Sequence, residues 1–274
     1  MFRAELLKLT TTTAPKVAVG VGVVGLLLTQ LTLVTLLPAL ASGAIGPGPE
    51  ALGGDVPAFA LESASAQLAA LNPLGSTSGG GSIGIAVIAI LILGVLAGTM
   101  DYRFGGIVPT ALAEPRRGRI LLAKVGSTAV VGLIVGAVFA VVSVVALLVS
   151  LPIAGVELAA SPAEIAGVLA RGVITVALLT LLGLAVGLLA RSQLVGVIVI
   201  ISVLLLEPIA QGVVQLVTGE LPIWAQLMPV SLGQATISPG SDGALAPLVA
   251  GLALAALTGA VLLAAGAALR SRDI

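Results

Sequence analysis

Long apolar stretches alternate with short polar segments along this chain. Each stretch has roughly 20 residues, the length that a helix needs to cross the hydrocarbon core of a bilayer. The pattern is typical of an all-α polytopic membrane protein, here a single transmembrane domain over residues 1–274. The six predicted spans are residues 17–41, 83–99, 121–150, 171–190, 193–210 and 245–268.

The basic residues predict how these spans are oriented. Five of the 12 Lys and Arg residues lie within 100–124. If the N-terminus is cytoplasmic, eleven of the twelve basic residues fall on the cytoplasmic side, and Arg171 alone lies near the outer interface. Such a bias is expected of cytoplasmic loops. We therefore expect cytoplasmic N- and C-termini, a cytoplasmic loop 100–120, an outside loop 42–82, and residence in a cell membrane such as a bacterial inner (plasma) membrane.

The N-terminal residues predict an amphipathic helix before the first span. Phe2, Leu6 and Leu9 fall on one helical face, whereas Glu5 and Lys8 lie nearer the other. A helix of this kind lies along the inner membrane surface. The alternative is that these residues are simply the cytoplasmic start of the first span.

The connection between the fifth and sixth spans, residues 207–243, is mildly apolar and rich in proline. It contains Pro208, Pro222 and Trp224, and it is too broken for one spanning helix. We expect a helix break at Pro208, followed by short re-entrant or interfacial helices on the outer side. In the outside loop 42–82, we expect Asp55 to cap a short helix.

Composition excludes several kinds of chemistry. Hydrophobic residues make up 58% of the chain and the mean hydropathy is +1.24. The chain has no Cys and no His, so it has no thiolate or imidazole for haem, copper, zinc or an assisted nucleophile. It also lacks a P-loop, and its two Gly-x-Gly-x-x-Gly matches lack the βαβ context of a nucleotide site. We expect no metal, no bound cofactor, no catalysis by this chain alone and, at zero net charge, no nucleic-acid partner.

Small and polar residues within the spans have two interpretations. Three pairs of glycines four residues apart allow close helix packing: Gly94 and Gly98, Gly132 and Gly136, and Gly183 and Gly187. Gln30 either lines a substrate path or hydrogen-bonds across helices. Glu207, expected at a helix break near the outer boundary, is either part of a gate or a hydrated helix end.

Two segments, 1–16 and 100–124, share a pattern of charged residues with nearby aromatic and proline residues: Glu5, Lys8, Asp101, Tyr102, Arg103, Phe104, Pro115, Arg116, Arg117 and Lys124. This pattern resembles the permease subunit of a type-2 ABC exporter. That family has six spans, an N-terminal Glu-x-x-Lys, an acidic-Tyr-Arg stretch after the second span, a Pro-Arg turn, and a Lys at the start of the third span. Asp101 stands where Glu is more usual, and Gly106 where Thr is typical.

The resemblance implies that these residues couple the membrane domain to separate ABC ATPase subunits. ATP and Mg²⁺ would be bound by those subunits, and a second permease chain, identical or similar, would complete an exporter. Three other functions remain open: a secondary transporter, a membrane enzyme, and a non-transporting assembly or immunity membrane protein. The missing His and Cys and the lack of clustered carboxylates argue against the enzyme.

Overall fold

The computed structural model describes residues 1–36, 39–40, 61–75, 84–106, 112, 116–238 and 245–271. These residues form helices and connecting turns, without a strand among them. They include six helices long and apolar enough to cross a membrane. The six are Thr13–Leu36 (α2 continued by the π-helical turn η1, Leu31–Leu36), α5 (Ile85–Arg103), α7 (Arg117–Ala154), α8 (Pro162–Ala190), α9 (Gln193–Thr218) and α12 (Pro247–Ser271). The all-helical fold with six candidate spans is confirmed.

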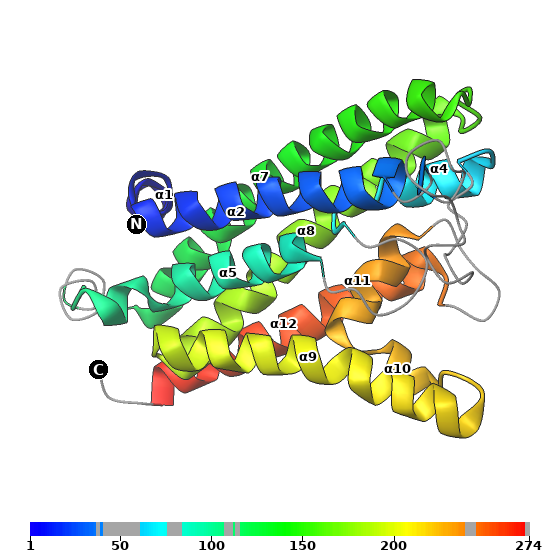
Figure 1. The fold of residues 1–274 in the computed structure, drawn as a ribbon. Coiled ribbons are helices and arrows are strands. Elements are labelled where there is room, and N and C mark those ends of the chain that lie inside the picture. Colours follow the sequence, from blue (N-terminus) through cyan, green and yellow to red (C-terminus); the bar gives the residue numbers. More distant parts are fainter. Residues whose placement is uncertain are drawn as a thin grey trace.

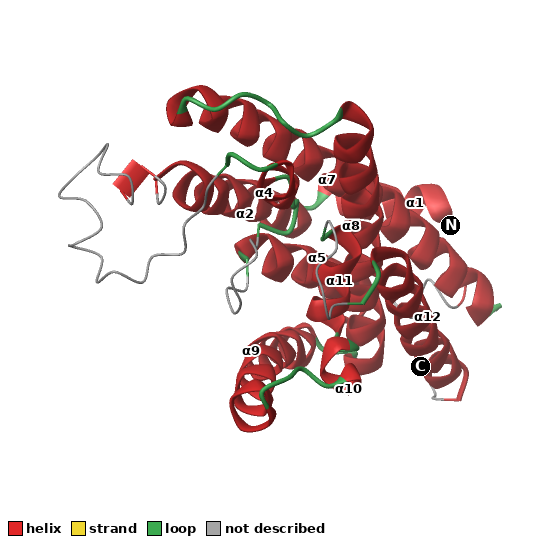
Figure 2. Ribbon diagram, turned by 90° about the vertical axis from the view of Figure 1, so that its right-hand side faces the viewer, coloured by secondary structure: helices red, strands yellow, loops and turns green. Residues whose placement is uncertain are grey.

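α5 and α8 form the centre of the bundle. In their most apolar windows 78% of α5 and 61% of α8 is buried, against 17% for α9 and 22% for α12. α8 contacts α5, α7, α9, α11 (Pro229–Ile237) and α12, and α2 packs on α5 and α7. Seen along the bundle in Figure 2, α8 and α11 lie between the other long helices.

Glycines bring the backbones of α5 and α8 into direct contact. A Cβ on Gly94 would lie 2.0 Å from the Thr180 carbonyl oxygen, and one on Gly183 would lie 2.2 Å from that of Leu91. Gly98 and Gly187 repeat this arrangement one turn further along. The glycine pairs of the sequence therefore pack helices within the bundle, as predicted. Gly132 and Gly136 bring α7 onto α8 in the same way.

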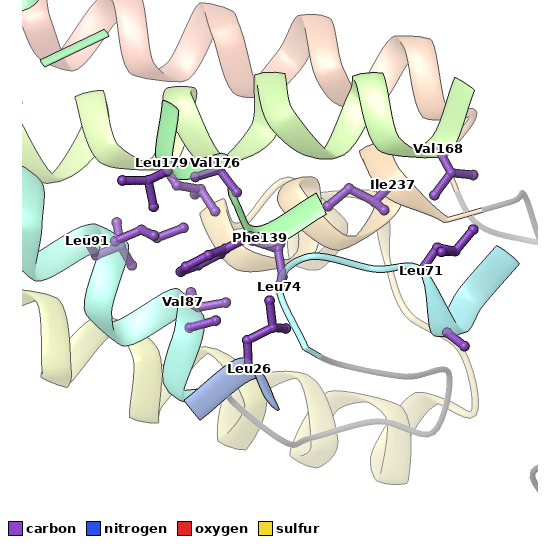
Figure 3. Packing of buried hydrophobic residues seen from close by; sticks show 14 of the residues in the cluster. Leu26, Leu71, Leu74, Val87, Leu91, Phe139, Val168, Val176, Leu179 and Ile237 are labelled. Carbon is purple, nitrogen blue, oxygen red and sulfur yellow. The ribbon is translucent and has the colours of Figure 1, made fainter. Parts of the chain in front are cut away.

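The main apolar core surrounds Phe139 of α7, whose side chain is fully buried. Figure 3 shows Phe139 between Val87 and Leu91 of α5 and Val176 and Leu179 of α8. α2 makes room for this ring at Gly22, where a Cβ would lie 2.7 Å from the Phe139 Cζ. The ring therefore joins four of the long helices.

α1 (Phe2–Thr11) and the end of α12 lie at the same end of the bundle. Figure 1 shows them, with the end of α5, on the left, opposite α10 (Ile223–Gln226) and α11. We call this the basic end, because Arg103, Arg116 and Arg191 lie there at helix ends. The opposite end, with the turns 155–161 and 219–222, is called the distal end.

The 61–75 segment is packed into the distal half of the bundle. It contains α4 (Ala64–Ala70), whose N-cap is Ser63, which accepts a hydrogen bond from the Ala66 N–H. The short helix therefore exists, but it begins later than a cap at Asp55 requires, and Asp55 itself lies outside the described residues. Leu71 and Leu74 are buried in the main core, so this part of the expected outside loop 42–82 is packed into the bundle.

α9 runs through Pro208 and ends at Thr218, so the predicted helix break at Pro208 is wrong. A proline interrupts the hydrogen-bond ladder at one point, and a helix packed in a bundle tolerates that loss. The chain then turns back, because α11 packs against α8 and α12. Gly233 of α11 lies at the level of Thr175 and Leu179, well inside the bundle.

Candidate functional site

Four charged side chains form a closed network at the basic end. Lys8 Nζ lies 2.7 Å from Glu5 Oε1 and 2.8 Å from Asp101 Oδ1. Lys124 Nζ lies 3.0 Å from Glu5 Oε2 and 2.6 Å from Asp101 Oδ2. Each cation thus contacts both carboxylates, and the four formal charges sum to zero. We call Glu5, Lys8, Asp101 and Lys124 the charge network.

The network is mostly removed from solvent. The side chains of Lys124, Asp101 and Glu5 are 3%, 4% and 7% exposed, whereas that of Lys8 is 36% exposed. Partial burial disfavours the charged form of Lys8, but its hydrogen bonds to Asp101 and Glu5 outweigh this effect and raise the pKa of its ammonium. Because buried charges are costly unless they are paired, each member depends on the others.

The network joins three helices that are distant in sequence. α1 supplies Glu5 and Lys8, the last turn of α5 supplies Asp101, and the second turn of α7 supplies Lys124. α1 is a separate helix, because Thr12 is extended (φ −72°, ψ 148°) and breaks it from α2. Leu9 packs in a second apolar cluster with Ala97, Met100, Leu184, Leu188 and Ala265. α1 is therefore fixed to the bundle by one charged and one apolar contact.

The residues expected to couple to an ATPase divide into two groups. Glu5, Asp101 and Lys124 are buried and satisfy one another, so no surface is available on them for a partner. Arg103, Phe104 and Arg116 are exposed, Phe104 at 69%. Pro115 lies outside the described residues. The expected loop 100–120 is shorter than predicted at both ends, because residues 101–103 complete α5 and residues 117–120 begin α7.

Two arginines bind the end of α12. Arg117 donates from Nη1 to the Leu269 carbonyl at 2.8 Å, and Arg191 donates from Nη2 to the Ala268 carbonyl at 3.5 Å. Cations at a helix C-terminus satisfy its unpaired carbonyls and interact favourably with its dipole. Arg117 is therefore half-buried against α12, whereas its neighbour Arg116 is exposed.

An open cleft of ≈ 610 Å³ lies beside the network at the basic end. Tyr102 and Arg103 of α5 form one wall, and residues 191–194 with Val197 form the other. Arg191 lies over the Tyr102 ring at 5.8 Å, and Arg103 Nη1 donates to Gln193 Oε1 at 2.6 Å. The sequence analysis counted Arg191 only among the eleven basic residues expected on the cytoplasmic side and gave no role to Gln193, because no local pattern pairs residue 191 with residue 102.

Gln30 is buried and hydrogen-bonded within the chain. Its amide donates to the carbonyls of Ala70 and Asn72 at 2.9 and 3.2 Å, and to Ser143 Oγ at 3.4 Å. Asn72 in turn donates to Gln234 Oε1 at 2.7 Å. Gln30 therefore ties α2 to the 61–75 segment and to α7, which is the cross-helix role considered for it.

Glu207 caps a helix from a neighbouring one. Its carboxylate accepts hydrogen bonds from the N–H groups of Val230 and Ser231 at 3.1 and 2.7 Å, and from Ser231 Oγ at 2.9 Å. Val230 and Ser231 are in the first turn of α11, where N–H groups lack helical partners. Glu207 is 4% exposed, so it is not a hydrated helix end. Gln211, one turn later, also bonds Ser231 and the Ala225 carbonyl.

The described residues contain no group of three or more acidic, His or Cys side chains placed to hold a metal ion. Comparison with protein-family models, with curated proteins and with solved structures finds no match.

Proposed function

We propose that this chain is the membrane-spanning subunit of an ATP-driven exporter, working with separate ABC ATPase subunits. The observation that carries the proposal is the charge network. It joins the N-terminal helix to the end of α5 and the start of α7. These elements belong to residues 1–16 and 100–124, the two segments that the family resemblance assigns to coupling. A force applied to any one of these elements reaches the other two directly.

The docking surface in this proposal is the exposed part of the basic end, with Arg103, Phe104 and Arg116. An apolar ring that is 69% exposed beside arginines has the composition of a contact anchor. The buried charge network is the support beneath this surface. In this arrangement the basic end is cytoplasmic, which agrees with the expected excess of Lys and Arg on that side.

The outer end of the proposed transporter is the distal end. Arg171 lies twenty residues before Arg191, about 30 Å along α8, which matches the thickness of the hydrocarbon core. Gly233 of α11 lies level with Thr175 and Leu179, which follow Arg171 by four and eight residues. At the helical rise per residue, Gly233 therefore lies about 6–12 Å deeper in the membrane than Arg171. We propose that α10 and α11 form the re-entrant outer segment, held in place by Glu207.

The remaining parts of the proposal follow from the family resemblance. A second permease chain, identical or similar, completes the transporter, and the substrate path runs between the two copies. The ATPase subunits bind ATP and Mg²⁺, and their closure rocks the two membrane domains. The complete assembly sits in a cell membrane, such as a bacterial plasma membrane.

The test is whether a P-loop ATPase is encoded beside this chain and co-purifies with it. Phe104→Asp should abolish co-purification and transport-linked ATP turnover, because it places a charge at the centre of the docking surface. Leu158→Asp is the matched control, since Leu158 is an exposed apolar residue (47%) at the distal end. If Phe104→Asp leaves both readouts unchanged, docking at this surface is refuted. If no ATPase partner is found, a secondary transporter becomes the better proposal.

A further inference from the structure

We propose that the cleft at the basic end binds the phosphate headgroup of an anionic phospholipid. The inference is independent of the ATPase, although the cleft shares Tyr102 and Arg103 with the coupling residues. The cleft has ≈ 610 Å³ of space, which is room for a headgroup and the start of an acyl chain.

The polar wall of the cleft has the chemistry of an anion site. Arg103 and Arg191 both line it, and no carboxylate of the described residues forms a salt bridge with either. The Tyr102 hydroxyl is buried and has no hydrogen-bond partner among the described residues. Because this oxygen has almost no solvent-accessible surface, the ring of Tyr102 and not its hydroxyl borders the cleft.

The start of α9 adds to this positive potential. Ser192 is the N-cap of the 26-residue helix, and its side chain makes no capping hydrogen bond. The first N–H groups of a helix have no partner within the helix and attract anions. Arg191, just before this helix, is the one described non-glycine residue with a positive φ, at 53°. Such a conformation costs free energy, and here it places the guanidinium over Tyr102.

The apolar wall of the cleft distinguishes a lipid from a soluble anion. Leu194 and Val197 line the cleft next to its polar groups, and Leu194 is 70% exposed. The apolar surface continues along α9 through Ile198, which is 53% exposed. A headgroup held by the arginines would therefore lay its acyl chain along α9. Basic pockets between spanning helices on the cytoplasmic side bind anionic lipids in this way.

The experiment uses the single tyrosine of the chain as a reporter. Protein labelled with 3-fluorotyrosine is placed in phosphatidylcholine nanodiscs, and phosphatidylglycerol is added in steps while the ¹⁹F resonance of Tyr102 is recorded. We expect a saturable shift with phosphatidylglycerol, and none with further phosphatidylcholine or with inorganic phosphate. Arg103→Gln combined with Arg191→Gln should weaken binding about tenfold or more, because charge-assisted hydrogen bonds are lost.

Two further variants make the result specific. Arg116→Gln removes an exposed basic residue of the same end outside the cleft and should leave the affinity unchanged. Arg191→Lys keeps the charge and should retain most of the binding if folding is intact. The proposal is overturned by an equal shift with phosphatidylcholine, by saturation with inorganic phosphate, or by an equal loss in Arg116→Gln. It is also overturned if only the ATPase subunits, and not phosphatidylglycerol, move the resonance.

Discussion

Lys124 Nζ lies 2.6 Å from Asp101 Oδ2, and neither side chain is more than 4% exposed. Removing one partner of such a pair leaves the other charge buried without compensation. We expect Lys124→Met to destabilise the protein by about 3–5 kcal/mol, measured by thermal unfolding in detergent. Glu5 and Asp101 would then share only Lys8 between them.

A double-mutant cycle separates this coupling from a simple packing loss. Asp101→Asn combined with Lys124→Met removes one charge of each sign, so the remaining pair of Glu5 and Lys8 is neutral. The double variant should lose clearly less stability than the sum of the two single variants. Additive losses would contradict a coupled network.

Removing the Glu207 carboxylate should release α11 specifically. Glu207→Ala leaves the N–H groups of Val230 and Ser231 without acceptors, each at a cost of about 1–3 kcal/mol when buried. Amide hydrogen exchange over residues 223–237 should rise, while exchange in α5 stays unchanged. Glu220→Ala, at an exposed residue of the same connection, should have no such effect. Equal exchange in both variants would show that the cap does not hold the segment.

The close glycine contact between α5 and α8 predicts that two similar Gly→Ala substitutions change the stability of the protein in opposite directions. Gly183→Ala would place a Cβ 2.2 Å from the Leu91 carbonyl oxygen, and we expect a loss of about 1–3 kcal/mol from overpacking. Gly259 of α12 has nothing within 4 Å of an added Cβ. Gly259→Ala should therefore stabilise the helix by up to about 1 kcal/mol. Thermal unfolding of the two variants compares these effects. If both substitutions change the stability in the same direction, the close contact at Gly183 is contradicted.

The absence of cysteine in the chain makes its orientation directly testable. Arg116→Cys places one thiol at the basic end and Leu158→Cys places one at the distal end. In intact cells a membrane-impermeant maleimide should label the second and not the first, and permeabilised cells should label both. The reverse labelling would place the basic end outside the cell.

The sequence alone predicted the features that depend on local pattern. Apolar length predicted the six spans, and the spacing of Gly94, Gly98, Gly183 and Gly187 predicted close packing. The N-terminal helix followed from the faces of Phe2, Leu6 and Leu9, although the structure packs Leu9 into the bundle. Each of these inferences needs only residues within a few turns of one another.

The features that were missed depend on distant residues. Lys8 meets Asp101 across 93 residues, and Lys124 meets Glu5 across 119, so no spacing rule connects them. These residues were predicted to contact a partner protein, but all four pair with one another and three of them are buried. Pro208 was read as a helix break because proline disrupts isolated helices, whereas here α9 continues to Thr218. Glu207 therefore caps α11, and its own helix, α9, continues past it.

The contact between α5 and α8 also limits how this protein can change shape. Carbonyl oxygens of one helix lie where Cβ atoms of the other would stand, so neither helix can rotate or slide past its partner without collision. The two helices must therefore move as one rigid body. In the proposed transporter, access across the membrane would then change at α9 and α12, whose apolar windows are less buried, and at the face formed by α2. Distance measurements between spin labels on α5 and α8 would stay constant through such a cycle.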